Sequence, residues 1–228
     1  MKKLIILTVT ALSLLFVTKA SAQIVRGSSS VSSVSSTQKS KKAQKTGIRY
    51  QGELNFGYAT GGKMNFKYDD GSTEKDKTDF SRPFIETVHG VRMLNDYLFV
   101  GAGLGFQYAY GKVYTDPDYD SSLTWDTVAI PLFVNFKGYY PLSNGFAPYI
   151  SWSIGGGIFA TSGLDDPEYD EKLKGGLYTT FGAGFNYRKF NFGFGLMHQG
   201  MKAVDTEDGE VYDKSSVNSF YVQLGFKF

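Results

Sequence analysis

The feature that most constrains the fold of this chain is a series of eight segments in which bulky apolar residues alternate with small or polar ones. They are residues 48–60, 82–94, 97–110, 124–139, 147–160, 176–188, 190–201 and 217–228. Alternation with a period of two residues is typical of a strand whose two faces have unlike environments. After the N-terminal segment, no apolar run reaches the roughly 20 residues that a helical membrane span needs. The sequence therefore predicts an all-β chain of eight strands.

The connections between these segments are long and short in turn. The long ones are residues 61–81, 111–123, 161–175 and 202–216, and the short ones centre on 95–96, 141–145 and 189. Outer-membrane barrels have an even number of antiparallel strands, with short turns at one end and long loops at the other. A soluble sandwich has no reason to segregate its turns in this way. We therefore expect an up-and-down transmembrane β-barrel over residues 48–228.

The two faces of the segments differ in size as well as polarity. The last segment places Phe220, Val222, Leu224, Phe226 and Phe228 on one face and Ser219, Tyr221, Gln223, Gly225 and Lys227 on the other. The third and seventh segments show the same contrast. A soluble barrel would have to expose the face of glycine and uncharged polar residues, whereas soluble surfaces carry far more charge. We expect the bulky face to meet lipid and the small or polar face to fill a narrow lumen.

Charged residues within the strands are candidates for a polar network in that lumen. They are Arg49, Glu53, Glu86, Arg92, Lys137 and Arg188. A lone Arg or Lys facing mid-bilayer hydrocarbon would cost about 2–4 kcal/mol, so an inward position is favoured. Two interpretations stay open for this network. The first is a structural plug of ion pairs, and the second is a gated polar path.

Aromatic residues cluster near both ends of the strands, as in the interfacial belts of membrane proteins. Those near the short turns are Tyr97, Tyr139, Tyr140, Tyr149 and Tyr187, and those near the long loops are Tyr58, Tyr108, Tyr110, Trp125 and Tyr178. We expect these rings to lie at the level of the lipid headgroups.

The N-terminal region is predicted to direct export. Lys2 and Lys3 precede an apolar stretch over residues 4–17, and small residues follow at 20–22. This pattern is typical of a cleaved signal peptide, here residues 1–22. Residues 23–47 are rich in Ser and Lys and contain no aromatic residue, so we expect a disordered tail. The chain has no cysteine, which excludes a lipoprotein anchor and a disulfide framework.

Charge is distributed unevenly along the chain. From residue 48 onward there are 16 basic and 22 acidic residues, a net charge of −6, so nucleic acid is not an expected partner. The loops at 61–81, 111–126, 161–175 and 202–216 carry −1, −3, −3 and −3. Asp116, Asp118 and Asp120 have the spacing of a calcium loop but lack its glycine and closing glutamate, so no metal site is predicted.

Two stretches resemble a known family. Residues 221–228 (YVQLGFKF) look like the C-terminal strand of outer-membrane proteins, which ends in an aromatic residue read by the barrel-assembly machinery. Residues 130–140 (IPLFVNFKGYY), followed by Pro148-Tyr149 and Gly155-Gly156-Gly157, resemble the porin-like outer membrane protein β-barrel domain family common in Bacteroidetes. That family is similar to small OmpA/OmpX-type barrels.

The resemblance implies an integral protein of a Gram-negative outer membrane, surrounded by lipid and lipopolysaccharide. Its role would be structural, or would depend on surface interactions of the acidic extracellular loops with a ligand that the sequence does not identify. The alternative is a narrow porin-like channel for small solutes or ions.

Catalytic chemistry is poorly represented in the sequence. A hydrolase needs a nucleophile, a base within hydrogen-bond reach and an orienting group. The chain has only two histidines, His89 and His198, and neither lies in such a pattern. By alternation His89 falls on the lipid-facing side, and His198 lies near the outer end of the seventh strand. We predict neither an enzyme nor a cofactor.

Overall fold

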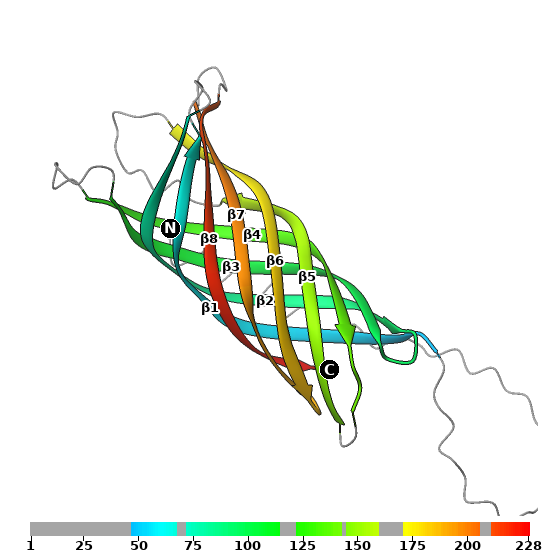
Figure 1. Ribbon diagram of the computed structural model, residues 1–228. Helices are drawn as coiled ribbons and strands as arrows, with labels where there is room; N and C mark the ends of the chain where they lie inside the picture. Colours follow the sequence, from blue (N-terminus) through cyan, green and yellow to red (C-terminus); the bar gives the residue numbers. More distant parts are fainter. Residues whose placement is uncertain (1–46, 68–71, 115–121, 143–144, 160–170, 206–210) are drawn as a thin grey trace, which may run out of the picture. The chain divides into compact units, whose positions relative to one another are not determined.

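The computed structural model describes residues 47–67, 72–114, 122–142, 145–159, 171–205 and 211–228. They form eight antiparallel strands, each paired with its neighbours in the chain, and β1 pairs with β8 to close the barrel (Figure 1). The strands are β1 (Arg49–Lys67), β2 (Thr73–Met93), β3 (Leu98–Tyr114), β4 (Ser122–Tyr139), β5 (Phe146–Phe159), β6 (Glu171–Tyr187), β7 (Phe190–Asp205) and β8 (Val211–Lys227). The predicted fold, an eight-stranded up-and-down barrel, is confirmed.

The predicted signal peptide, nearly all of the predicted tail and the calcium-like aspartates lie outside the described residues. None of the residues that the structure describes form a helix long and apolar enough to cross a bilayer.

The strands extend further into the predicted long loops than the alternation indicated. Residues 61–81 were expected to form a loop, but β1 and β2 continue as a paired hairpin out to Lys67 opposite Thr73. Main-chain pairing satisfies the backbone whatever the side chains are, so a strand can outlast its apolar alternation. A register shift follows Thr60, where Gly61 and Gly62 have positive φ angles of 55° and 144°. A side chain at Gly62 would overlap the main chain of Asn218, so this irregularity requires glycine.

All three short turns lie at one end of the barrel, opposite the end where β1 and β2 form their hairpin, as predicted (Figure 1). The β2–β3 turn has Leu94, Asn95 and Asp96 in the left-handed region, at φ angles of 52°, 56° and 75°. Asn and Asp tolerate this region better than other residues with a side chain, which explains why the turn forms here. Arg188, at φ 55°, forms the β6–β7 turn with Lys189.

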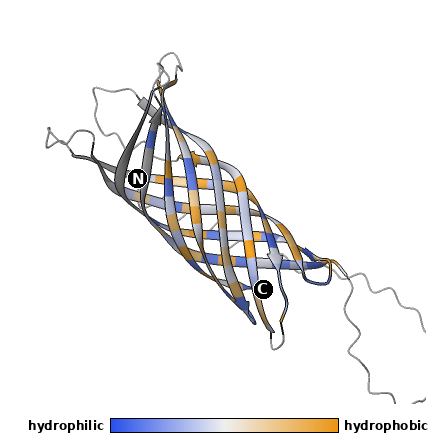
Figure 2. Cartoon of the chain, in the orientation of Figure 1, coloured by the Kyte–Doolittle hydropathy of each residue, from blue (hydrophilic) through white to orange (hydrophobic). Residues whose placement is uncertain are grey.

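The outer surface of the barrel is apolar. Figure 2 shows hydrophobic and hydrophilic residues alternating along the strands, and most of the bulky apolar side chains are exposed on the outside. Exposed side chains of this kind include Leu132, Ile150, Phe181, Leu196 and Leu224. A water-soluble monomer rarely exposes an apolar patch larger than a few hundred Å². The prediction that the Phe- and Leu-rich face points outward is confirmed.

The inner face is not filled by small and polar residues alone, which corrects part of the prediction. Three phenylalanines lie buried inside the barrel, namely Phe84, Phe99 and Phe133. Each ring fills space beside an inward-facing glycine, and a Cβ atom added at Gly57, Gly101 or Gly103 would overlap the ring of Phe84, Phe99 or Phe133 respectively. The absence of a side chain at these glycines therefore leaves the space that the phenylalanine rings occupy.

Candidate functional site

The lumen holds the polar side chains of the barrel and is the candidate functional site. Every strand contributes at least one buried polar residue to it, because side chains at alternate positions of a closed barrel all point to one interior. Those with the largest polar groups are Gln51, Glu53, Asn55, Arg82, Glu86, Gln107, Asn135, Lys137, Asn186, Asn191, Gln199 and Gln223.

The centre of the network is a buried ion pair between Lys137 of β4 and Glu53 of β1. Their side chains are 2% and 0% exposed. Glu53 also accepts hydrogen bonds from Gln51 Nε2 at 2.7 Å and from the Tyr139 hydroxyl at 3.2 Å. The Lys137 ammonium has a second contact with the face of the Tyr149 ring, 5.0 Å from its centroid. This pair joins strands that are not neighbours, so it ties opposite walls of the barrel together.

A second charged group closes the lumen toward the short turns. Arg92 donates to Gln51 Oε1 at 3.3 Å and to the main-chain carbonyl of Asp96, and its guanidinium lies 4.2 Å from the centroid of the Tyr139 ring. Arg49 pairs with the Asp96 carboxylate, but its side chain is 47% exposed. Arg49 therefore belongs to the rim of the barrel and not to its interior.

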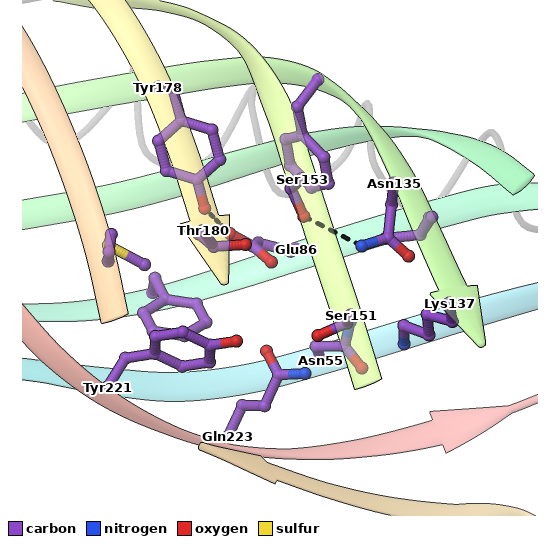
Figure 3. A pocket seen from close by; sticks show the side chains of 14 residues that line it. Asn55, Glu86, Asn135, Lys137, Ser151, Ser153, Tyr178, Thr180, Tyr221 and Gln223 are labelled. Carbon is purple, nitrogen blue, oxygen red and sulfur yellow. Dashed lines mark hydrogen bonds between the residues drawn. The ribbon is translucent and has the colours of Figure 1, made fainter. Parts of the chain in front are cut away.

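Glu86 lies in a different part of the lumen from Glu53. Its carboxylate accepts a hydrogen bond of 2.7 Å from the Tyr178 hydroxyl, and no ion pair of Glu86 occurs among the described residues. Figure 3 shows Glu86 and Tyr178 facing each other across the interior, with Asn135 bonded to Ser153 beside them. The void enclosed by these groups measures about 10 Å³. This is close to the least space that one water molecule occupies.

The prediction for Arg188 is wrong. It was expected on the inner face of the sixth strand, but that strand ends at Tyr187 and Arg188 begins the exposed turn. Its guanidinium lies over the Tyr187 ring, 5.3 Å from the centroid, on the outside of the barrel. Because a tight turn interrupts the alternation of faces, the period-two pattern no longer gives the direction of a side chain once the strand has ended.

Three tyrosines predicted for the interfacial belts lie inside instead. Tyr139, Tyr149 and Tyr178 are all buried, and each hydroxyl donates a hydrogen bond within the barrel. Alternation could have found Tyr139, since it lies two residues after Lys137 on the same face. The remaining tyrosines of the predicted belts are exposed on the outer surface, and their level relative to the headgroups stays a prediction: Tyr58, Tyr97, Tyr108, Tyr110, Tyr140 and Tyr187. The side chain of Trp125 lies outside the described residues.

Sequence reasoning also missed Arg82, a buried cation of β2 that lies on the same face as Glu86 and Arg92. It stood at the boundary of a predicted strand, where the alternation is weakest. Arg82 is four residues from Glu86, so alternation places both side chains on the same face, and this spacing could have identified Arg82.

Neither histidine lies in the lumen network. His89 accepts or donates a hydrogen bond of 2.5 Å with the Tyr50 hydroxyl and one of 2.9 Å with Thr87, on the outward side of β2. His198 pairs with Asn218 at 2.7 Å near the long-loop end of β7. Among the described residues there is no cluster of acidic and histidine side chains suited to a metal ion. The chemistry that the lumen offers is ion pairing and hydrogen bonding.

Comparison with known proteins places the fold. No family model matches the chain, and no curated protein matches it. Among solved structures, the outer membrane protein OprG from Pseudomonas aeruginosa is similar, with 15% identity, a TM-score of 0.51, and coverage of 81% of this chain and 97% of OprG. The outer membrane protein AlkL, determined in lipid bilayers, has 13% identity, a TM-score of 0.50, and coverage of 86% and 97%. At these identities, the likeness concerns the fold.

Proposed function

We propose that this chain, which has the fold of the small OmpA/OmpX-type outer-membrane barrels, is an integral outer-membrane protein with a structural or surface-contact role. The apolar outer surface supports insertion into a bilayer. The main support for this role is that side chains fill the lumen. A barrel without an open pore can contact other molecules only through its loops, its turns and its outer surface.

The lumen is obstructed at several levels. The Glu53–Lys137 pair crosses it, Phe99 and Tyr178 are completely buried within it, and Arg92 lies across the short-turn end. Two voids within the described part of the lumen measure about 10 and 20 Å³ and share no lining residue. An eight-stranded barrel is only wide enough for its own side chains, whereas open aqueous channels have 16–18 strands.

The surface-contact part of the proposal rests on the segments 61–81, 111–126, 161–175 and 202–216, which include the outer ends of the strands as well as the connections between them. Their sequences carry net charges of −1, −3, −3 and −3, which favours basic partners or divalent cations shared with lipopolysaccharide phosphates. At the other end, Phe228 is bonded to the first strand through two main-chain hydrogen bonds with Gly52, of 2.9 and 3.0 Å. We propose that this terminal strand is the part recognised by the barrel-assembly machinery.

Cell fractionation tests the location. The protein should appear in the outer membrane, should be released only by detergent, and should migrate on a gel at different positions before and after heating. Recovery in the aqueous phase without detergent would contradict the proposal.

Conductance separates the closed barrel from the alternative, a narrow channel for small solutes or ions. We expect the refolded protein to give no steady ohmic openings in a planar bilayer, since the two voids described above are separate and each holds little more than one water. A wide porin reconstituted in the same way serves as the positive control. Reproducible single-channel steps from the purified barrel would favour the channel and would overturn the structural role.

A further inference from the structure

Lysines form a row across the strands near the long-loop end of the barrel. Lys174 of β6 is paired in register with Lys202 of β7, and Lys202 is paired in turn with Lys214 of β8. All three side chains are exposed. The same register places Lys67 of β1 opposite Lys214, so lysines occupy one row of four adjacent strands. Although these segments are acidic in sequence, strand pairing brings their lysines together.

The row lies on the outward face of the barrel. On β7, Met197 and Met201 are buried inside. Lys202 alternates with them and shares the outward face with Leu196 and His198. Lys174 and Lys214 are on the same face, because directly paired residues of neighbouring antiparallel strands point to the same side. The lysines therefore continue the surface that is apolar further down the strands.

The height of this row corresponds to the headgroups of the outer leaflet. Lys202 follows Phe190, at the short-turn end of β7, by twelve residues. At about 3.3 Å per residue and a strand tilt of about 40°, this distance is about 30 Å along the bilayer normal. The apolar band of a membrane barrel is about 25 Å tall. With Phe190 at the inner edge of that band, Lys202 lies just beyond its outer edge.

A row of like charges is stabilised by an anion. Directly paired side chains of antiparallel strands have Cβ atoms about 5 Å apart, and like charges in such pairs destabilise a sheet. An anion that contacts two or three of the ammonium groups removes this repulsion. The lysine ammonium binds phosphate as a point charge on a flexible stem, so a row of lysines adapts to phosphates in several positions. Lipopolysaccharide carries its phosphates at the headgroup level of the outer leaflet.

We propose that Lys174, Lys202 and Lys214 bind the phosphate groups of lipopolysaccharide on the outer wall of β6–β8. The acyl chains of this lipid lie against the apolar residues further down. Between the two regions lie His198 and Asn218, which are hydrogen-bonded at 2.7 Å. The inference rests on the outer-membrane location proposed above, and it adds the face of the barrel and the lipid group that this face recognises.

Binding of two forms of one glycolipid tests the proposal. The refolded full chain in detergent micelles is titrated calorimetrically with lipopolysaccharide and with the same lipid after its phosphates have been removed. A basic residue beside an anionic lipid surface contributes about 1 kcal/mol, which is about five-fold in affinity. We expect Lys202→Gln/Lys214→Gln to weaken binding of the phosphorylated form about thirty-fold, with binding of the dephosphorylated form unchanged. The matched control, Arg188→Gln/Lys189→Gln, removes two exposed cations at the opposite end and should bind like the wild type.

The stability of the same variants provides a second measurement, in which the lipid should reverse their order. Without phosphorylated lipid, the double lysine variant should unfold at a higher urea concentration than the wild type, because one pair of like charges is gone. With saturating phosphorylated lipid, the wild type should be the more stable, since it binds the lipid more tightly.

Equal affinity of the wild-type barrel for the two forms would overturn the proposal, and carboxylates of the loops would then be what neutralises the lysines. An equal loss of affinity in the control variant would also overturn it, because binding would then depend on overall charge. Failure to associate with either form would count against the outer-membrane location as well, so the two failures are distinguishable.

Discussion

Glu53→Gln should lower the free energy of unfolding by about 3–5 kcal/mol, the usual cost of removing one partner from a buried ion pair. The substitution keeps the size of the side chain and its contacts with Gln51 and Tyr139. It leaves the ammonium of Lys137, which is 2% exposed, without an opposite charge at hydrogen-bond distance. Only the ring of Tyr149 then faces that charge among the contacts described above.

The reverse substitution should cost less. In Lys137→Met the Glu53 carboxylate keeps two donors, Gln51 and the Tyr139 hydroxyl. The double variant should be more stable than Glu53→Gln alone, because it contains no unpaired buried charge. The measurement is urea unfolding of the refolded barrel, followed by tryptophan fluorescence for all three variants.

A surface pair of the same barrel serves as the control. Arg49 and Asp96 are also paired, but their side chains are 47% and 37% exposed. Exposed pairs contribute about 0–1 kcal/mol, so Arg49→Met should have little effect. If Glu53→Gln were as mild as Arg49→Met, the ion pair would not lie in a closed lumen.

Val134→Arg should destabilise the inserted barrel by about 2–4 kcal/mol, the cost of an arginine facing the middle of a bilayer. Val134 points outward near the middle of the apolar stretch of β4, opposite Ala102 and Ile154 in the neighbouring strands, and is 41% exposed. In water, by contrast, an arginine at so exposed a position would change stability by less than about 0.5 kcal/mol.

Tyr140 provides the matched control, since it is exposed and directly follows the short-turn end of the same strand. Tyr140→Arg should cost about 0–1 kcal/mol, because the penalty falls away toward the interface. Unfolding of both variants from lipid vesicles gives the two values. Equal costs at the two positions would show that the side chain at position 134 does not lie in the middle of the bilayer.

The alternation of side chains was enough to predict the strand number, the order of long and short connections and the outward face. These features depend on local sequence, because every strand of the barrel meets lipid on one side and the lumen on the other. The ends of the strands could not be predicted in this way. Beyond the apolar stretch, the β2 side of the hairpin runs through residues 73–79, which contain no apolar residue and therefore no period-two pattern to follow.

The interior was harder to predict because it depends on which residues meet across the barrel. Phe133 lies inside because Gly103 of the adjacent strand leaves room for its ring, and that requires the register of β3 and β4. Tyr178 lies inside because its hydroxyl reaches Glu86, a residue far away in the sequence. Arg188 was misplaced because its strand ended one residue earlier. In each case the deciding partner is distant in the chain or belongs to a turn.

The lipid exposure of the outer face is tested most directly at Trp152, an outward residue of β5 that is 46% exposed and lies between Phe136 and Phe181 of the neighbouring strands. Trp125→Phe makes it the sole tryptophan of the chain. In vesicles, its fluorescence should be quenched strongly by lipids brominated in the middle of their acyl chains and only weakly by acrylamide in the water. Strong quenching by acrylamide with no effect of the brominated lipids would mean that this face meets water, and the chain would not be a membrane barrel.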